Sequence, residues 1–176
     1  MELFWFVGYV KSCHENRVAE TLARMGVETY LPTRKEKRRW SDRTKIVDVK
    51  LLPGRIFIHT TKERRNPLLE YFPNKSLYGY MSQGGSHNPV IVPDAQMETF
   101  RTMVDNANGQ FVRFVETPLA AGDKVRITQG PFIDFECVLV QVDGKKCMGV
   151  PVGPLGTAVI EISSDVLERI ESDKKQ

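Results

Sequence analysis

Glycine and proline divide the C-terminal third of this sequence into short pieces. After residue 122, turn signals recur at Gly130 with Pro131, at Asp143 with Gly144, and at residues 153 to 156. Between them lie runs of β-branched residues, which favour strands over helices. About five strands in so few residues predict a small closed β-barrel.

The first 110 residues show a different pattern, in which apolar strands alternate with helices. Phe4 to Val10 is a continuous aromatic and β-branched run, typical of a central strand covered on both faces. A helix follows, in which Ser12 and Glu15 have the spacing of a capping box and Gly26 suits a left-handed C-terminal cap. Further strands are expected at residues 29 to 32, 45 to 52, 55 to 59 and 77 to 81, with helices around residues 67 to 72 and from residue 94.

The composition is that of an ordinary soluble globular protein. Among 176 residues, 25 Lys and Arg against 22 Asp and Glu leave a formal charge of only +3, so any nucleic-acid contact must come from local clustering. The apolar start lacks the basic region of a signal peptide, and no segment approaches the roughly 20 apolar residues of a membrane span. We therefore expect a cytoplasmic protein with no membrane partner.

The sequence indicates neither a catalytic site nor a metal site. Cys13, Cys137 and Cys147 have no Cys-x-x-Cys spacing, and the three histidines are scattered. Cys13 and His14 are adjacent, but neighbouring helical residues point in different directions and do not form a nucleophile and base pair. We predict a protein that is not an enzyme, with reduced thiols, no cofactor and no metal.

Basic residues gather in two places that suit nucleic acid. Residues 34 to 45 carry seven Lys and Arg and one tryptophan, and we expect them to form a solvated hairpin tip. Such residues can hold phosphates and stack on bases, although hairpin tips are also charged simply for solubility. The candidates in this stretch are Arg38, Arg39, Trp40 and Arg43.

A second basic strip is expected along the exposed side of the first helix. Its cationic candidates are Lys11, Arg17 and Arg24, and His14 and Asn16 could bond or stack with bases. The alternative is a solvated helix face on which Glu20 balances the arginines.

Two segments resemble the NusG family of transcription factors. Trp5-Phe6-Val7 and the run from residue 51 to 57, LLPGRIF, look like the NusG N-terminal domain, and residues 122 to 135 are similar to the KOW motif. Within the family, Tyr30-Leu31-Pro32 and the tip at residues 40 to 43 are closer to the specialised branch that includes RfaH and the UpxY regulators of capsule loci.

The resemblance implies an α+β protein with two domains. We expect a ferredoxin-like α/β sandwich of the NusG N-terminal (NGN) type over residues 1–110, a linker over 111–121 and an SH3-like KOW β-barrel over 122–176. The implied function is binding of RNA polymerase through the first domain and suppression of pausing or termination, at specific operons such as polysaccharide loci. A general NusG-like elongation factor and a KOW-containing RNA-binding or ribosome-associated module are the alternatives.

The resemblance also implies partners and sites. An apolar depression on the first domain would receive the polymerase clamp helices, and the basic helix would lie near single-stranded DNA or RNA of the elongation complex. Periodicity alone would bury about half of the matching apolar residues, which favours core for Val7 and Met97 and contact for Tyr9, Pro53 and Tyr78. The full set of polymerase-binding candidates is Val7, Tyr9, Leu52, Pro53, Phe57, Tyr78, Met97 and Phe100.

For the C-terminal domain, the resemblance implies a ribosomal protein or a termination factor as partner. Leu155 would be the apolar contact, or it would simply close the end of the barrel. The likeness to RfaH also raises the question of a helical hairpin as a second state of this domain. Glycines and prolines from residue 149 to 156 oppose it, because an interior proline costs a helix about 3 kcal/mol and a glycine about 1 kcal/mol. We predict the barrel, while a state with only residues 135 to 142 helical stays open.

Overall fold

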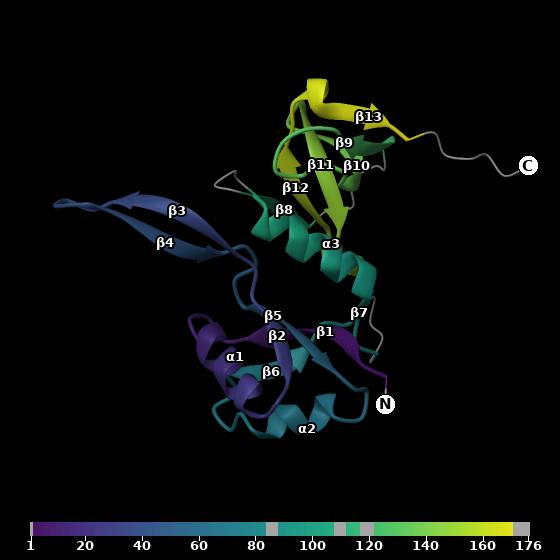
Figure 1. The fold of residues 1–176 in the computed structure, drawn as a ribbon. Helices are drawn as coiled ribbons and strands as arrows, with labels where there is room; N and C mark the ends of the chain where they lie inside the picture. The colour runs from purple at the N-terminus through teal and green to yellow at the C-terminus, as the bar shows by residue number, and fades with distance from the viewer. Residues whose placement is uncertain (1, 84–87, 108–111, 117–121, 171–176) are drawn as a thin grey trace, which may run out of the picture. The chain divides into compact units, whose positions relative to one another are not determined.

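The computed structural model of the protein describes residues 2–83, 88–107, 112–116 and 122–170 (Figure 1). The chain divides into two compact units. The first consists of Met1–Thr33 and Lys50–Met97, and the second of Arg34–Val49 and Glu98–Gln176. The fold is mixed, with strands outnumbering helices among the described residues.

An antiparallel sheet forms the first unit. Its strands run in the order β2-β5-β1-β6, and the short β7 also pairs with β1. All residues of β1 are buried or half-buried, which confirms the predicted central strand. The bounds are Phe4–Val10 for β1, Glu28–Tyr30 for β2, Arg55–Thr60 for β5, Leu77–Tyr80 for β6 and Ile91–Val92 for β7.

Two helices, α1 (Glu15–Arg24) and α2 (Arg65–Glu70), pack on one face of this sheet. Val18 and Leu22 from α1 and Leu68 from α2 meet apolar side chains of the strands in one buried cluster. Gly26 follows α1 with φ +70°, so the predicted left-handed cap is confirmed. The strand residues of the cluster are Val10, Ile56, Ile58 and Leu77.

The start of α1 differs from the predicted capping box. His14 is the N-cap, and no side chain caps the helix. Glu15 is instead only 3% exposed: its Oε1 accepts a hydrogen bond from the Gly54 N–H at 2.9 Å, and its Oε2 lies 3.6 Å from Lys50 Nζ. Burial alone would raise the pKa of Glu15, but the N–H groups of Gly54 and of Glu15 itself, together with Lys50, outweigh it and hold the pKa below its usual 4.5. Glu15 therefore ties the start of α1 to the turn before β5.

The second unit contains a six-stranded antiparallel sheet, in the order β13-β9-β10-β11-β12-β8. Asp143 and Gly144, both with positive φ, join β10 and β11 as a tight hairpin, which confirms that predicted turn. Residues 136 to 142 form a strand in this structure, between the turn signals at Gly130-Pro131 and Asp143-Gly144. The bounds are Arg113–Val115 for β8, Lys124–Ile127 for β9, Glu136–Val142 for β10, Lys145–Pro151 for β11, Thr157–Glu161 for β12 and Leu167–Arg169 for β13, with 3₁₀ turns η1 (Gly153–Leu155) and η2 (Ser164–Val166).

Strand β8 lies within the stretch expected to be a linker. It pairs with β12, and the Phe114 ring packs edge-on against Phe100 of α3 (Asp94–Asp105), with 6.4 Å between ring centroids. Arg113 forms an ion pair of 3.0 Å with Asp143 at the β10–β11 turn. The two compact units of the structure therefore have other bounds than the predicted domains and linker. The division into domains at residues 110 and 121 stays a prediction.

A hairpin of β3 (Thr33–Arg39) and β4 (Thr44–Lys50) forms a two-stranded sheet of its own. The Trp40 N–H donates to the Arg43 carbonyl at 2.8 Å, so the connecting loop is short. The prediction that the whole basic stretch forms a tip is therefore wrong, because residues 34 to 39 lie on β3. Both faces of this hairpin are largely exposed to solvent, so its strands do not need alternating apolar and polar residues. The usual sequence pattern of a strand is therefore absent from residues 34 to 39.

The buried Glu15 carboxylate predicts a pH-dependent contribution to stability. We expect Glu15→Ala to lower the free energy of unfolding by about 1–3 kcal/mol near neutral pH, because the Gly54 N–H and Lys50 lose their partner. The folded-state pKa of Glu15 is depressed, so its contribution is present above a pH of about 4.5 and is lost as the pH falls through the folded-state pKa. Denaturant titrations of both proteins at neutral pH and at a pH of about 3 measure this difference. Glu20→Ala, on the exposed side of α1, is the control, and a difference that does not shrink in acid would contradict the assignment.

Candidate functional site

The sheet of the first unit has a second face, opposite to the helices. Side chains alternate along a strand, so Trp5, Val7 and Tyr9 of β1 point away from the helical cluster. Val7 pairs with Phe57 of β5, and both are fully buried. Trp5 stacks on His59 with 4.4 Å between ring centroids. The half-buried Tyr9 is the point at which this face begins to reach solvent.

A β-bulge places a second tyrosine beside Tyr9. Tyr9 pairs with Gly79 while Val10 pairs with Leu77, so Tyr78 is an extra residue on β6. The Tyr9 and Tyr78 rings stack with 5.9 Å between centroids and 14° between planes, and Tyr78 is 56% exposed. The bulge thus presents an aromatic pair at the edge of the sheet.

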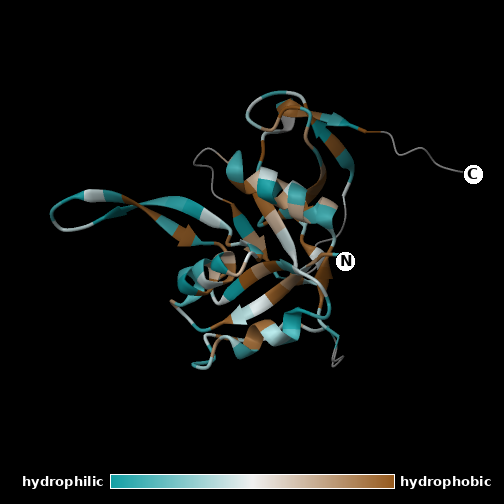
Figure 2. Ribbon diagram, turned by 60° about the horizontal axis from the view of Figure 1, so that its bottom comes forward, coloured by the Kyte–Doolittle hydropathy of each residue, from teal (hydrophilic) through white to brown (hydrophobic). Residues whose placement is uncertain are grey.

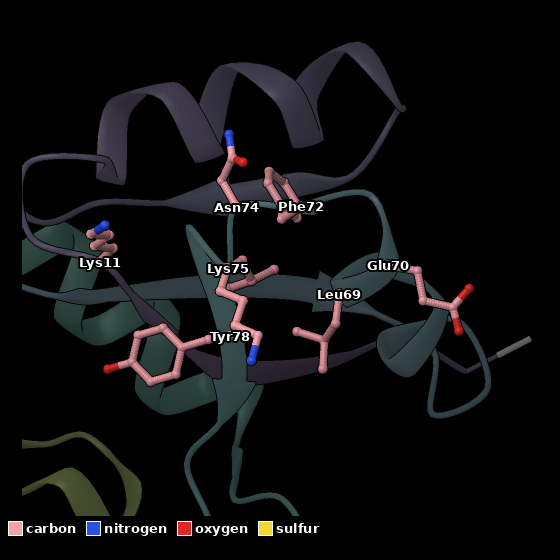
Figure 3. Close-up of a pocket in the computed structure, with 8 residues that line it drawn as sticks. Lys11, Leu69, Glu70, Phe72, Asn74, Lys75 and Tyr78 are labelled. Carbon is pink, nitrogen blue, oxygen red and sulfur yellow. The ribbon is translucent and has the colours of Figure 1, made fainter.

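A shallow groove of ≈ 760 Å³ lies beside this pair (Figure 3). The Lys11 N–H donates to the Ser76 carbonyl at 2.8 Å, which brings the end of β1 to the start of β6. The same groove is therefore lined by Lys11 and Tyr78. The sequence analysis expected Lys11 to contact nucleic acid and Tyr78 to contact polymerase. Its lining residues are Lys11, Leu69, Glu70, Phe72, Asn74, Lys75, Leu77 and Tyr78.

The sequence analysis did not identify Asn74 and Lys75 as candidates for this groove, because only the pairing of β1 with β6 brings them close to Lys11. Lys75 has φ +50°, in a turn that precedes β6. A Lys beside an Asn before an aromatic strand carries no local signal for a binding site.

The apolar candidates fall into buried and exposed groups. Tyr9 is half-buried, and Pro53 and Tyr78 are exposed, in agreement with the division into core and contact expected from periodicity. These three are the side chains that offer surface to a partner in this structure. The other five, Val7, Leu52, Phe57, Met97 and Phe100, are at most 3% exposed, and Phe100 belongs to the second unit. Contact of any of the eight with a partner stays a prediction.

The basic side of α1 is exposed. Arg17, Arg24 and Asn16 all face solvent, and no ion pair joins either arginine to Glu20 among the described residues. His14 is half-buried and its Nδ1 donates to the Ser12 carbonyl at 2.9 Å, which leaves Nε2 for another partner. The arginines are therefore available to an anionic ligand.

The hairpin separates the basic candidates that the sequence grouped together. Glu36 on β3 forms ion pairs with Arg34 at 3.2 Å and with Arg38 at 3.3 Å, and these arginines hold the pKa of Glu36 below its usual value. Residues two apart share a face, so Arg38 and Trp40 lie on the Glu36 side and Arg39 lies on the other. Trp40 is 55% exposed, and Arg43 lies 3.6 Å from Asp42 at the tip.

Leu155, the candidate contact of the C-terminal domain, is only 3% exposed. It ends the turn η1, which is closed by a 2.9 Å hydrogen bond from the Val152 N–H to the Gly156 carbonyl. Gly156 has φ +134° and no space for a Cβ against the Val115 backbone, so this turn is tightly determined. Burial agrees with closure of the sheet end, and a partner contact at Leu155 stays a prediction.

Two family models match the chain. The family described as "Transcription termination factor nusG" matches residues 3–101, and the KOW motif matches residues 121–161. A solved structure described as "Domain interaction in Thermotoga maritima NusG" is 25% identical, covers 97% of this chain and 99% of its own, and aligns with a TM-score of 0.49. No curated protein matches the chain. No helix of the described residues is long and apolar enough to cross a membrane.

Burial gives a direct test of the part played by Leu155. We expect Leu155→Ala to lower the free energy of unfolding by about 2–5 kcal/mol, because it removes a buried side chain and leaves a cavity. Ile133→Ala is the control, since Ile133 is 60% exposed in the same unit, and its effect should stay within about 0.5 kcal/mol. Denaturant titration of the full chain measures both. Equal stability of the two variants would show that Leu155 does not support the fold.

Proposed function

Because this chain belongs to the NusG family of transcription factors, we propose that it binds RNA polymerase through its N-terminal domain, residues 1–110, and suppresses pausing or termination. The family acts in transcription elongation and termination, and its members interact with RNA polymerase and nucleic acid. Neither NusG proteins nor KOW modules are enzymes.

The stacked pair of the half-buried Tyr9 and the exposed Tyr78 is the observation that carries the polymerase proposal. Aromatic side chains that are held rigidly at the surface are frequent anchors of protein interfaces, because they bury a large area at a small entropic cost. Here the bulge brings Tyr78 beside Tyr9, and the two rings stack with 5.9 Å between centroids. Pro53, exposed in the turn before β5, would extend the contact on the same unit.

The basic side of α1 supports nucleic-acid binding in the same complex. Arg17 and Arg24 are exposed, and Lys11 lines the groove beside Tyr78. A single strand of DNA or RNA would be held by charge and could stack on the exposed tyrosine. Asn16 and His14 are the candidates for base-specific hydrogen bonds.

We further propose that the protein acts at specific operons, such as polysaccharide loci, in the manner of the RfaH and UpxY branch. The exposed basic helix and the charged hairpin support this over a general elongation role. Residues 1–110 would have the ferredoxin-like arrangement of an NGN domain, and residues 122–176 would form an SH3-like KOW barrel that binds a ribosomal protein or a termination factor. An RNA-binding or ribosome-associated KOW module is the rival, and it would need no polymerase surface.

Removal of one exposed ring tests polymerase binding. We expect Tyr78→Ala in the full chain to weaken affinity for purified core RNA polymerase at least tenfold, as for an interface anchor. Tyr71→Ala is a matched control, because Tyr71 is 63% exposed and does not line the groove. Biolayer interferometry with immobilised polymerase measures both, and circular dichroism checks the fold. If the full chain does not bind polymerase, or if the two variants bind equally well, the proposed surface is wrong.

Charge reversal on α1 tests the nucleic-acid contact. We expect Arg17→Glu with Arg24→Glu to weaken recruitment to a paused elongation complex and to reduce the salt dependence of binding by about one unit of slope per lost phosphate contact. Folding should be unchanged, since both side chains are exposed. Lys124→Glu with Lys146→Glu, on the second unit, is the control of equal charge change. If the affinity for the paused complex at low salt is unchanged, Arg17 and Arg24 are ordinary solvated surface residues and do not contact nucleic acid.

A further inference from the structure

The β3–β4 hairpin forms a sheet of its own, and most of its side chains are exposed. An isolated two-stranded hairpin is only marginally stable in water. Figure 2, in which this hairpin lies at the left, shows mainly hydrophilic residues along it. The exposed side chains of the hairpin are therefore open to a ligand.

Two backbone hydrogen bonds fix the register of the hairpin. The Trp40 N–H donates to the Arg43 carbonyl at 2.8 Å, and the Leu51 N–H donates to the Pro32 carbonyl at 2.9 Å. Side chains alternate along each strand, and residues directly opposite each other share a face. The outer half of one face therefore carries four side chains, which we call the tryptophan face: Arg38, Trp40, Arg43 and Lys45.

Charge does not distinguish the two faces of the hairpin. On the face that lacks Trp40, the exposed Asp48 lies opposite Lys35. On the side of Trp40, Glu36 forms an ion pair of 3.3 Å with Arg38. The difference lies in the tryptophan itself, which is the one aromatic residue between positions 33 and 50.

The Trp40 ring is exposed, and it makes no ring contact within the part of the chain that the structure describes. Its exposed fraction is 55%, and neither another aromatic ring nor a cation lies against it. Trp5, the other tryptophan of the chain, is only 4% exposed and stacks on His59. Trp40 therefore offers a free aromatic surface.

Three cationic side chains surround this ring. Arg43 lies directly opposite Trp40, and Arg38 and Lys45 form the next opposite pair along the strands. Like charges directly opposite each other destabilise a sheet. An anion bound between Arg38 and Lys45 would relieve this repulsion.

The acids near the tryptophan face leave its cations accessible. Lys45 forms no ion pair with any described residue. Arg38 and Arg43 have exposed fractions of 56% and 69% in their pairs with Glu36 and Asp42. Exposed ion pairs contribute little to stability, so a phosphate can compete with either carboxylate.

We propose that the tryptophan face binds single-stranded nucleic acid, with a base stacked on Trp40 and the neighbouring phosphates held by the three cations. Proteins that hold single strands combine cationic side chains with aromatic rings on which bases stack. In a duplex the bases stack on each other, so stacking on Trp40 selects a single strand. Sequence grouping placed Arg39 in this site, but the register puts Arg39 on the other face and brings in Lys45. The inference needs no polymerase and does not rest on the proposed function.

Tryptophan fluorescence of the full chain reports the proposed contact directly. Stacking on a base quenches indole fluorescence, and Trp5 is buried, so oligothymidylate or oligouridylate should quench the signal of Trp40. In Trp40→Phe the quenching should disappear. Fluorescence anisotropy of a labelled oligonucleotide should show that this variant keeps most of its affinity, because phenylalanine also stacks.

Matched variants on the two faces separate the site from the rest of the hairpin. We expect Trp40→Ala to weaken binding at least about fivefold, whereas Ile46→Ala, a change of a 57% exposed side chain on the other face, should leave it unchanged. Lys45→Gln should reduce the slope of log affinity against log salt by about 0.7, as for one lost phosphate contact on a single strand. Lys37→Gln, on the other face, should not change this slope. Circular dichroism should be the same for all variants.

Three outcomes would overturn the proposal. Equal losses for Trp40→Ala and Ile46→Ala would assign the effect to the hairpin as a whole. Duplex DNA bound at least as tightly as the single strands, with the same loss in Trp40→Ala, would show that stacking is not the contact. No binding, or binding without quenching, would exclude Trp40 from the interface. Binding of either the DNA or the RNA strand with the expected losses supports the proposal, and the tighter one identifies the strand.

These measurements use bare oligonucleotides and are distinct from the test of polymerase binding. Failure of the Tyr78 test would leave the result for Trp40 unchanged, and failure of the Trp40 test would leave the polymerase surface unchanged.

Discussion

The first unit depends on the strand β1, which hydrogen-bonds to β5, β6 and β7. Gly8 lies at the middle of this strand, and a Cβ there would meet Leu77, Ile58 and Ile56 side chains at 2.9 to 3.2 Å. These side chains belong to the cluster under α1 and α2, so the absence of a side chain at Gly8 lets the sheet and the helices close together. The same strand carries Tyr9 and ends at Val10, directly before Lys11, so the position of the groove depends on the core.

Much of this architecture could be predicted from local sequence. The apolar run of β1, the cap at Gly26 and the Asp143-Gly144 hairpin are each determined by residues within a few positions. The role of Glu15 was predicted wrongly because its spacing from Ser12 is that of a capping box, whereas its actual partners, Lys50 and Gly54, lie far away in sequence.

The binding surfaces were less accessible to sequence reasoning, because exposure is decided by packing. Alternation along strands separated Tyr9 from its buried neighbours, but it could not show that a bulge turns Tyr78 toward it. The composition likewise indicated a basic hairpin, but it could not show which side chains lie on each of its two faces. Glu36 and Asp42 are the two acids among residues 34 to 45, and only the strand geometry shows that Glu36 pairs with Arg34 and Arg38.

The pairing of β8 with β12 has a consequence for how the protein can be divided. Residues 113 to 115 cover the edge of β12, and Arg113 fastens them to Asp143 across the sheet. A fragment that begins at residue 122 would retain the KOW match after its first residue but would lose this covering strand. The bare edge of β12 would then present unpaired backbone groups, which are a template for pairing between molecules. We therefore expect such a fragment to self-associate more readily than the full chain.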